Sequence, residues 1–442
     1  MTPADRSAVP TPTKALSRLP ADRSATVVIV GASVGGVRTA QALRRESYEG
    51  RIVLIGAESE LPYDKPPLSK QFLAGQWAAE RVGLLTEAAA EQAGIDMRLG
   101  SVADHLAVAE HQVVLAGGDR IDYDVVVAAT GSLARASPWA AESGVHVLRT
   151  IGDSRALADD LAKGGPVLVV GGGFIGAEVA ATTRALGHEV TIVDPLEVPV
   201  GRVLGGAVGA LFTDLHHRNG VTTHFGSGVE SVEGRAGDLA VRLTDGETLH
   251  AATVVVGIGA RPNDGWLASS GLLVEDGVIC DEFCRAVDAP EVFAVGDVAR
   301  WMHLGHGESC RVEHWTNAVE QASCVAHNIA HPDELRSYRP VEYVWSDQYD
   351  WKIQIVGRPT RATRHQLIGD LGRPTGPDAT KPRAVALYAD ESGRFTAAAI
   401  VNWPKALIAS RKMIAAGASF DEAVTALRQV AETPPAPART PA

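Results

Sequence analysis

VVIVGASVGG (residues 27–36) and VLVVGGGFIG (residues 167–176) are two glycine fingerprints of the same kind, about 140 residues apart. Each follows a short apolar run typical of a buried strand and opens a segment with helical periodicity. In a G-x-G-x-x-G pattern, the glycines allow a tight turn, a close backbone approach to a pyrophosphate and close packing of helix on strand. Two such units predict two dinucleotides on one polypeptide, which indicates electron or hydride transfer between two cofactors.

The composition of the chain is that of a folded α/β protein. Hydrophobic residues make up 45% and charged residues 21% of its 442 residues, which is ordinary for a globular chain and wrong for a disordered one. Single cores rarely grow beyond about 250 to 300 residues, so this length favours about two to four domains. The formal net charge of -12 argues against nucleic-acid binding through the whole surface.

No segment of the sequence indicates export or a membrane span. The N-terminal stretch lacks the apolar core of a signal peptide, and no run of about 18 apolar residues occurs. We therefore expect a cytoplasmic protein without membrane or nucleic-acid partners.

The four cysteines are too few for a disulfide framework in a chain this long. Cys280 and Cys284 lie four positions apart and imitate a metal or redox pair, while the other two are Cys310 and Cys324. No second pair of the C-x-x-C type supports a zinc site. We expect a structural or incidental role for these cysteines and no metal site.

Each fingerprint lies in a strand-helix-strand pattern. The predicted segments of the first unit are 26–30, 34–45 and 51–55. Those of the second unit are 167–170, 174–186 and 189–193. Gly187 follows the second helix at the position where glycine commonly ends one.

The remaining strand-like segments divide into a middle group and a C-terminal group. The middle group comprises 112–115, 122–129, 239–243, 253–256 and 292–295, with a hairpin signal at 117–119. From about residue 339 the pattern changes to an antiparallel sheet over 343–345, 352–356, 384–388 and 397–401, followed by helices at 405–416 and 420–430.

These segments predict an α/β protein with two Rossmann-like domains and a smaller α+β domain. The predicted parts are a disordered tail at 1–22, a discontinuous first dinucleotide domain at 23–131 and 257–336, a second dinucleotide domain at 132–256, a C-terminal α+β domain at 337–431 and a disordered tail at 432–442.

The first fingerprint is imperfect. Gly31 and Gly36 occupy the outer glycine positions, but Ser33 replaces the middle glycine, so the pattern also fits a simple tight turn. Glu58 follows the next strand, where an acidic group accepts hydrogen bonds from a ribose. Ala57 beside it leaves the register of that acid open, and the alternative is a solvated loop residue.

The second fingerprint is complete, and Asp194 lies 18 residues after its last glycine. Its glycines are Gly171, Gly173 and Gly176. An aspartate at this position binds an adenosine ribose and repels a 2′-phosphate, so we expect NADH to be preferred over NADPH. Arg184 and Arg202 are candidates for softening that preference.

Three further segments are candidates for ligand contact. LPYDKPPLSKQF (residues 61–72) contains prolines that fix the backbone, which suits a Lys70 that faces a cofactor; the alternative is a rigid surface loop. ATG (residues 129–131) and Gly296–Asp297 each follow a strand, at the sheet edge where α/β proteins bind ligands. Asp297 is equally well explained as a turn former.

Together the segments resemble a known family, the FAD-dependent, NADH-oxidising ferredoxin reductases of cytochrome P450 and ring-hydroxylating dioxygenase systems. The resemblance covers about residues 26–428. Its segments are GASVGGVRTAQALR (31–44), PYDKPPLSK (62–70), ATG (129–131), LRTIGD (148–153), GGGFIGAEVA (171–180), GIGARPN (257–263), VFAVGDVA (292–299), EHWTNAVEQ (313–321) and WSDQYDWKIQIVG (345–357). The chain departs from the family pattern at Ser33, at Ala57 and Glu58, and at Lys65 before Pro66.

The resemblance implies a glutathione-reductase-like fold, with FAD at the first fingerprint and NADH at the second. It implies FAD contacts at Gly31, Val34, Gly35, Gly36, Lys70, Arg149, Asp297 and Trp315. Further cofactor contacts are expected at Ser33, Ala57, Glu58, Lys65, Pro67, Ala129, Thr130, Gly131, Gly296, Glu313, His314, Gly171, Gly173, Gly176, Asp194, Arg202 and Gly259. Phe174, Ile175 and Glu178 are expected to line the nicotinamide slot, with Lys70 paired to Glu178 beside the flavin.

The implied partner is a small acidic iron–sulfur ferredoxin that feeds a cytochrome P450 or a dioxygenase, and the implied oligomeric state is a monomer or weak homodimer. We expect a basic docking patch at Arg311, Lys405, Arg411 and Lys412, with Trp345 near the electron exit. Helix capping is the alternative role for Arg411 and Lys412.

Three other functions remain open at this point. The segment directly after Pro67, LSKQFLAG (residues 68–75), contains no cysteine, so a disulfide reductase or thiol-dependent oxidase is disfavoured. A rubredoxin or monodehydroascorbate reductase also lacks that thiol and differs mainly in its electron acceptor. A nonenzymatic flavin redox sensor is the alternative from a different class.

Overall fold

A computed structural model describes residues 24–371 and 382–432 of the chain. These residues form two compact units. The first contains residues 24–64, 83–133 and 261–340, and the second contains residues 65–82, 134–260, 341–371 and 382–432. The predicted disordered tail at 1–22 and residues 433–442 of the other tail lie outside the described residues, while Glu432 ends a helix.

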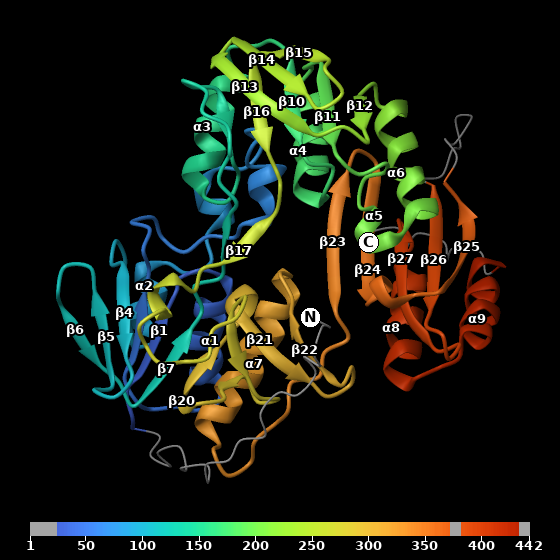
Figure 1. Ribbon diagram of the computed structural model, residues 1–442. Coiled ribbons are helices and arrows are strands. Elements are labelled where there is room, and N and C mark those ends of the chain that lie inside the picture. The colour runs from blue at the N-terminus through green and yellow to red at the C-terminus, as the bar shows by residue number, and fades with distance from the viewer. Residues whose placement is uncertain (1–23, 372–381, 433–442) are drawn as a thin grey trace, which may run out of the picture. The chain divides into compact units, whose positions relative to one another are not determined.

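The first unit is built on a nine-stranded sheet in the order β22-β21-β18-β19-β20-β7-β1-β2-β3 (Figure 1). The strands that pair in parallel around the first fingerprint are β1 (Val27–Val30), β2 (Ile52–Ile55), β3 (Ile95–Arg98), β7 (Val125–Ala128) and β20 (Ala289–Ala294). The others are β18 (Val278–Cys280), β19 (Arg285–Ala286), β21 (Ala299–His303) and β22 (Glu308–Arg311).

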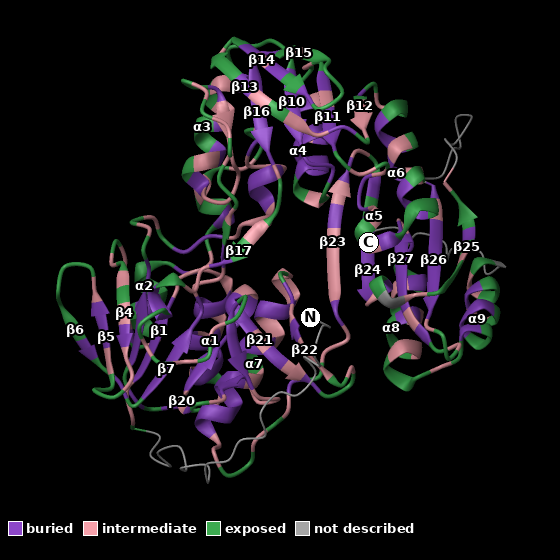
Figure 2. Cartoon of the chain, in the orientation of Figure 1, coloured by how far each residue is buried: buried purple, intermediate pink, exposed green. Residues whose placement is uncertain are grey.

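The central strands of this sheet consist of continuous apolar residues because both faces are covered. All four residues of β1, β2 and β7 are buried, and Figure 2 shows the labelled strands β1 and β7 in purple. Helices α1 (Val34–Arg45) and α7 (Trp315–Ala330) pack against each other and against the core of this unit. Helix α2 (Glu87–Gln92) and a small antiparallel sheet of β4 (Ala103–Ala107), β5 (Gln112–Leu115) and β6 (Arg120–Asp122) complete the unit.

The second unit begins from a five-stranded parallel sheet in the order β12-β11-β10-β16-β9. Its strands are β9 (Val145–His146), β10 (Val167–Val170), β11 (Val190–Asp194), β12 (Thr222–Phe225) and β16 (Thr253–Val256). Its helices are α3 (Ile151–Leu161), α4 (Phe174–Ala185), α5 (Gly201–Leu204) and α6 (Gly206–Arg218). An antiparallel sheet of β13 (Val229–Arg235), β14 (Asp238–Leu243) and β15 (Thr248–Ala251) packs on it.

A second five-stranded sheet of this unit is antiparallel, in the order β23-β24-β27-β26-β25. Its strands are β23 (Tyr343–Gln348), β24 (Trp351–Gly357), β25 (Arg364–Asp370), β26 (Arg383–Ala389) and β27 (Phe395–Val401). Helices α8 (Pro404–Ala416) and α9 (Phe420–Glu432) cover one face. The other face packs on α5 and α6, where Phe212 meets Trp351 edge-on at 5.7 Å.

These elements confirm the predicted fold class of two Rossmann-like sheets and a C-terminal α+β region. Strands β8 (Ser132–Ala134) and β17 (Ala260–Pro262) lie where the chain passes from one unit to the other. The described residues contain no helix with the length and apolarity needed to cross a bilayer. The domain boundaries predicted from the sequence stay predictions.

Candidate functional site

The first fingerprint forms a tight connection between β1 and α1. Gly31 has φ of +120°, and a Cβ built there would lie 2.2 Å from the carbonyl oxygen of Ala129. A Cβ at Gly36 would lie 1.8 Å from the carbonyl oxygen of Gly31. Both distances are shorter than any real side chain tolerates, so only glycine lets α1 start this close to the sheet.

The helices that follow the two fingerprints do not cap their own N-termini. At Ser33 before α1 and at Gly173 before α4, no side chain accepts a hydrogen bond from the first turn, and neither first turn contains an acidic residue. Thr86 and Thr150 cap α2 and α3 with their side chains, while α5, α6, α7 and α8 also lack a side-chain cap but do not follow a glycine fingerprint. The first N–H groups of α1 and α4 are therefore directed at a ligand or at water, and phosphate is the group that such helix ends favour.

The two glycine loops differ at their middle position. A Cβ at Gly173 would meet nothing within 4 Å, and the φ of this residue is an ordinary -71°. The open space in front of Gly173 is where a pyrophosphate fits over the N-terminus of α4. Ser33 takes the same place in the first loop, with its side chain making no cap bond to α1.

Glu58 is the oriented acid after β2. The hydroxyl of Tyr63 donates a hydrogen bond to its carboxylate, and Glu58 is half-buried, whereas Ala57 is exposed. The structure thus supplies a carboxylate at the end of β2, as ribose binding requires, although the ribose contact itself stays a prediction.

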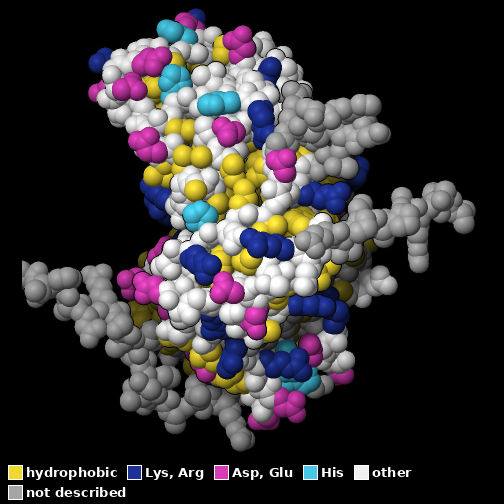
Figure 3. Space-filling model, turned by 90° about the vertical axis from the view of Figure 1, so that its right-hand side faces the viewer, with side chains coloured by type: hydrophobic (Ala, Val, Ile, Leu, Met, Phe, Trp, Pro, Cys, Tyr) yellow, Lys and Arg dark blue, Asp and Glu magenta, His cyan; other side chains and the backbone are white. Residues whose placement is uncertain are grey.

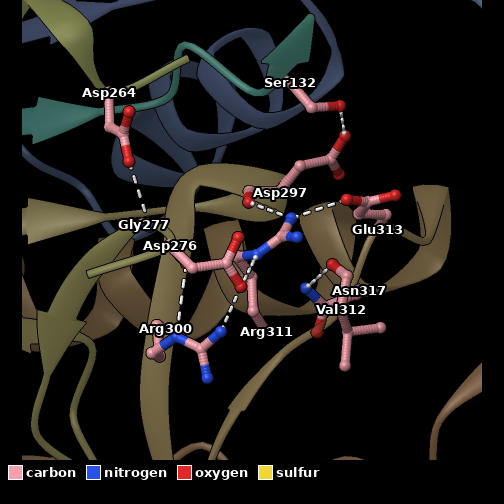
Figure 4. Close-up of polar contacts among 10 residues, drawn as sticks. All are labelled: Ser132, Asp264, Asp276, Gly277, Asp297, Arg300, Arg311, Val312, Glu313 and Asn317. Carbon is pink, nitrogen blue, oxygen red and sulfur yellow. Dashed lines mark hydrogen bonds and ion pairs between the residues drawn. The ribbon is translucent and has the colours of Figure 1, made fainter. Parts of the chain in front are cut away.

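Asp297 lies in a network that holds the turn after β20 (Figure 4). The hydroxyl of Ser132 donates to Asp297 Oδ2 at 2.6 Å. The preceding amide of Gly296 donates to Gln321 Oε1 of α7 at 2.7 Å. The carboxylate is therefore fixed by β8 and its turn by α7, which is the preorganisation that a binding group needs.

Arg311 supports the same turn from β22. Its guanidinium donates to the carbonyl oxygen of Asp297 at 3.2 Å and pairs with Asp276 at 3.1 Å and Glu313 at 2.6 Å (Figure 4). Burial by itself lowers the pKa of Arg311, but the hydrogen bonds to these two carboxylates raise it overall. Only 13% of the side chain is exposed. Arg311 thus acts inside the unit, and this geometry weakens the sequence argument for it as a docking residue.

Three hydrogen bonds join other predicted cofactor segments within the first unit. Trp315 Nε1 donates to Asp64 Oδ1 at 2.6 Å, which ties the start of α7 to the proline-rich segment. Thr130 Oγ1 donates to the carbonyl oxygen of Asn263 at 2.6 Å, and the amide of Asn263 donates to the Gly131 carbonyl at 2.9 Å. Segments far apart in the sequence therefore meet around the carboxyl ends of β1 and β7.

In the second unit, Asp194 ends β11 and lies against the glycine loop. Its Oδ2 accepts from the Gly172 amide at 2.7 Å and its Oδ1 accepts from the Leu196 amide at 2.8 Å. Each carboxylate oxygen has a further lone pair, so both remain able to accept from a ribose. Arg202 is exposed, whereas the guanidinium of Arg184 donates to the carbonyls of Asn219 and His188.

Two exposed isoleucines flank this loop. Ile175 lies in the first turn of α4 after β10, and Ile258 follows the neighbouring parallel strand β16. Large apolar side chains at the carboxyl ends of adjacent strands suit the flat face of a nicotinamide. Ile258 was not among the residues predicted from the sequence, although it lies beside Gly259, which was.

Glu178 is the centre of a buried polar cluster on α4. Its Oε1 lies 3.0 Å from Lys70 Nζ, and the two side chains are only 4% and 10% exposed. Ser69 donates to Oε2 at 2.5 Å and Ser346 of β23 donates to Oε1 at 2.7 Å. The ion pair expected between Lys70 and Glu178 is present, and the two serines were missed.

Serine and threonine hydroxyls also hold the proline-rich segment in the second unit. Ser154 of α3 donates to the Leu68 carbonyl and Thr182 of α4 donates to the Ser69 carbonyl, both at 2.8 Å. Lys65 Nζ lies 3.5 Å from the carbonyl oxygen of Arg149. Arg149 precedes the capping box of Thr150 and Asp153, which explains the LRTIGD segment physically.

The predicted docking residues of the second unit lie on α8 and β23. Lys405, Arg411 and Lys412 are exposed, and no basic residue lies in the last turn of α8, so helix capping does not explain them. Trp345 is half-buried and stacks on Tyr343 at 6.1 Å. On the face drawn in Figure 3, Lys and Arg side chains lie among hydrophobic and acidic ones.

The thiols are unsuited to redox catalysis. All four cysteines are free, and Cys280, Cys284 and Cys310 are buried. Burial raises the pKa of Cys280 and Cys284 well above the usual range and that of Cys324 to about 11. Groups this reluctant to form thiolate are poor nucleophiles.

Two Rossmann-like sheets, each with an uncapped glycine-lined helix N-terminus and an acid after the following strand, define the class of two-dinucleotide oxidoreductases. The family model described as pyridine nucleotide-disulphide oxidoreductase matches residues 25–322, and the model described as reductase C-terminal matches residues 343–431. The chain belongs to the pyridine nucleotide-disulphide oxidoreductase family, and its cofactors are FAD and NAD(H).

The relatives confirm the resemblance seen in the sequence. The chain is 38% identical to the anthranilate 1,2-dioxygenase system ferredoxin--NAD(+) reductase component of Burkholderia cepacia, over 89% of this chain and 95% of the relative. It is 32% identical to rhodocoxin reductase of Rhodococcus erythropolis, over 88% and 89%.

Solved structures of ferredoxin reductases have the same fold as this chain. The ferredoxin reductase for the CYP199A2 system of Rhodopseudomonas palustris superposes with a TM-score of 0.84 at 31% identity, over 89% of this chain and 95% of that one. The covalent putidaredoxin reductase–putidaredoxin complex gives a TM-score of 0.84 at 30% identity, over 91% and 99%.

Proposed function

We propose that this protein is a ferredoxin reductase that oxidises NADH and passes single electrons to a small acidic iron–sulfur ferredoxin serving a cytochrome P450 or a ring-hydroxylating dioxygenase. The observation that carries the proposal is the pair of uncapped glycine-lined helix N-termini, one in each unit. Relatives named as ferredoxin reductases along nearly the whole chain support it.

The polypeptide contributes binding and orientation to this reaction. When bound, FAD takes up two electrons as hydride from NADH and releases them singly, which is chemistry that side chains lack. The N-terminus of α1 and the carboxylate of Glu58 would hold its phosphates and ribose, with Asp297 preset by Ser132. The Lys70–Glu178 pair keeps an ammonium group at a fixed place in a dry cluster.

Absence of an available thiol favours a one-electron acceptor over a disulfide. Buried cysteines with raised pKa values do not attack a disulfide or peroxide at neutral pH. Among acceptors, a ferredoxin fits the exposed basic residues of α8 better than a small organic radical does, because only a protein needs a docking surface. We further propose a cytoplasmic monomer or weak homodimer.

The nucleotide preference is expected to depend on Asp194. Asp194→Asn keeps the shape of the side chain and one hydrogen-bond acceptor oxygen, but it removes the negative charge that repels a 2′-phosphate. The kcat/KM for NADH should therefore fall by about 10-fold, while the kcat/KM for NADPH rises. Steady-state reduction of ferricyanide with each nucleotide measures both values. Asp214→Asn, on an exposed position of α6, is the matched control and should change neither. Equal use of both nucleotides by the unsubstituted protein would contradict this assignment.

The docking proposal predicts a salt-dependent loss of activity. Lys405→Glu combined with Lys412→Glu should lower ferredoxin-dependent cytochrome c reduction by about 10-fold at low salt, because like charges repel an acidic partner. Ferricyanide reduction should stay unchanged, since that acceptor needs no docking site. Arg235→Glu, an exposed residue of β13, is the control. Unaltered ferredoxin turnover and salt dependence in the double variant would place the docking site elsewhere.

A further inference from the structure

The C-terminal ends of α1 and α7 meet at three side chains that no part of the proposed reaction uses. Glu46 follows the last residue of α1, and His331 follows the last residue of α7. The amide of His331 donates to the His327 carbonyl at 2.8 Å, so the two histidines lie one helical turn apart. Their rings stack with centroids 4.6 Å apart.

The donor atoms of these residues have the spacing of a metal site. Glu46 Oε2 lies 3.0 Å from His331 Nε2 and 3.6 Å from His327 Nδ1, and all three ligand atoms lie within 4.8 Å of one another. A tetrahedral ion with bonds of about 2.0 to 2.2 Å holds its ligand atoms about 3.3 Å apart. The observed distances bracket that value without any rearrangement of the backbone.

His327 provides an independent indication of a ligand. Its Nε2 lies 3.0 Å from the carbonyl oxygen of Glu334, which only accepts, so Nε2 carries the hydrogen. The other nitrogen, Nδ1, is buried and has no hydrogen-bond partner. The side chain is 5% exposed, and Nδ1 is aimed at the carboxylate of Glu46. A metal-binding histidine shows this arrangement, with its far nitrogen fixed by a carbonyl and its near lone pair directed at the ion.

The electrostatic surroundings favour a cation. Two helix C-termini end at this place, and each carries a partial negative charge from its last carbonyl groups. Glu46 adds a full negative charge. His331 is 26% exposed and Glu46 is 33% exposed, so the cluster is open to solvent on one side. That opening gives an ion an entry path and leaves a position for a water ligand.

We propose that Glu46, His327 and His331 bind one divalent transition-metal cation of the Zn²⁺ class, with water completing a tetrahedral shell. Two imidazole nitrogens and one carboxylate oxygen suit Zn²⁺ and disfavour Ca²⁺ and Mg²⁺, which prefer oxygen ligands alone. The ion ties the end of α1 to the end of α7. Its role is structural, and it does not depend on the proposed electron acceptor.

The sequence indicates the two histidine ligands of this site but not the glutamate. His327 and His331 follow the H-x-x-x-H spacing that places both rings on one helix face, but Glu46 lies 281 residues earlier. The expectation of no metal site therefore rested on cysteine spacing alone. The pairing of α1 with α7 is what brings the third ligand to the other two.

Zinc titration of the flavin-loaded protein tests the proposal. The full chain, purified without a histidine tag and treated with EDTA, is titrated with ZnCl₂ by calorimetry and by competition with a chromophoric chelator. We expect one saturable site per chain, and a thermal midpoint that rises by about 2 to 4 °C or more at 100-fold excess over Kd. Co²⁺ in place of Zn²⁺ should give tetrahedral d–d bands at longer wavelengths than the flavin absorption.

Two ligand variants and a matched control test which side chains bind zinc. Glu46→Gln and His331→Ala should each lower zinc affinity by about 100-fold and abolish the thermal shift, while both keep the flavin spectrum. His105→Ala removes an exposed histidine of the same unit and should change neither. Retained affinity in both variants, or no site on the unsubstituted chain, would overturn the proposal. A third result would also overturn the proposal: EDTA leaves the thermal midpoint unchanged, and each variant lowers this midpoint by the same amount with and without zinc. The three side chains would then stabilise the protein by hydrogen bonds alone.

Discussion

Replacing Gly36 with alanine is expected to yield a folded protein that has lost its flavin and its yellow colour. The added Cβ would lie 1.8 Å from the carbonyl oxygen of Gly31, and neither atom belongs to a flexible side chain. Helix α1 must move by more than an ångström to relieve this overlap, which carries its N-terminal N–H groups away from the pyrophosphate. Displacements of that size cost about 100-fold in affinity or more.

The second fingerprint provides the matched variant. A Cβ at Gly176 would lie 2.0 Å from the Gly171 carbonyl oxygen, so Gly176→Ala disturbs α4 in the same way. It should keep FAD but lose reduction by NADH at ordinary concentrations. Absorbance at the flavin maximum and NADH titration of each variant distinguish the two outcomes, with circular dichroism as the check on folding. If the Gly36 variant retained flavin and the Gly176 variant lost it, the assignment of the two sites would have to be reversed.

Replacing Lys70 with methionine is expected to destabilise the protein by about 3 to 5 kcal/mol, because Glu178 would be left buried without a counter-ion. Ser69 and Ser346 still donate to the carboxylate and recover part of that loss. Combining Lys70→Met with Glu178→Gln removes both charges, so stability should return toward that of the unsubstituted protein. Urea unfolding of the four proteins in this cycle gives the coupling energy of the pair.

An exposed ion pair in the same unit is the control for this cycle. Arg242 lies 2.9 Å from Glu230, and both side chains are exposed, so Arg242→Met should cost less than about 1 kcal/mol. In the double variant at Lys70 and Glu178, NADH should nevertheless reduce the bound flavin more slowly than in the unsubstituted protein, because we expect the pair to position the reacting groups. Full stability together with full activity in Lys70→Met alone would show that this pair has neither role.

The parallel sheets could be predicted from the sequence because their signal is local. VVIV, IVLI and VLVV are continuous apolar runs, each followed by a glycine. The predicted edges of β1, β10 and α1 differ from the observed ones by at most one residue. The predicted C-terminal strands and helices were likewise found. Strand β25 was missed because most of its residues are exposed and carry no apolar run.

The interiors of the sites could not be predicted in the same way, because they depend on residues far apart in the chain. Ser346 reaches Glu178 across 168 positions, and Arg311 is held by Asp276 across 35. No pattern in the sequence reveals the contacts of Arg311 with Asp276 and Glu313, since a charged residue beside a strand fits an internal contact and a docking role equally well; the docking role itself stays a prediction. Only the pairing of the strands and helices decides which side chains meet.

An anaerobic titration measures whether this protein moves electrons from NADH through FAD to a ferredoxin. The purified yellow protein is titrated with NADH while the flavin absorbance is followed, and an oxidised [2Fe–2S] ferredoxin is then added. We predict that NADH bleaches the flavin, that NADPH at equal concentration does so far less, and that the ferredoxin restores the flavin absorbance as its own is lost. A flavin that NADH leaves oxidised, or a reduced flavin that ferredoxin does not reoxidise, would contradict the account.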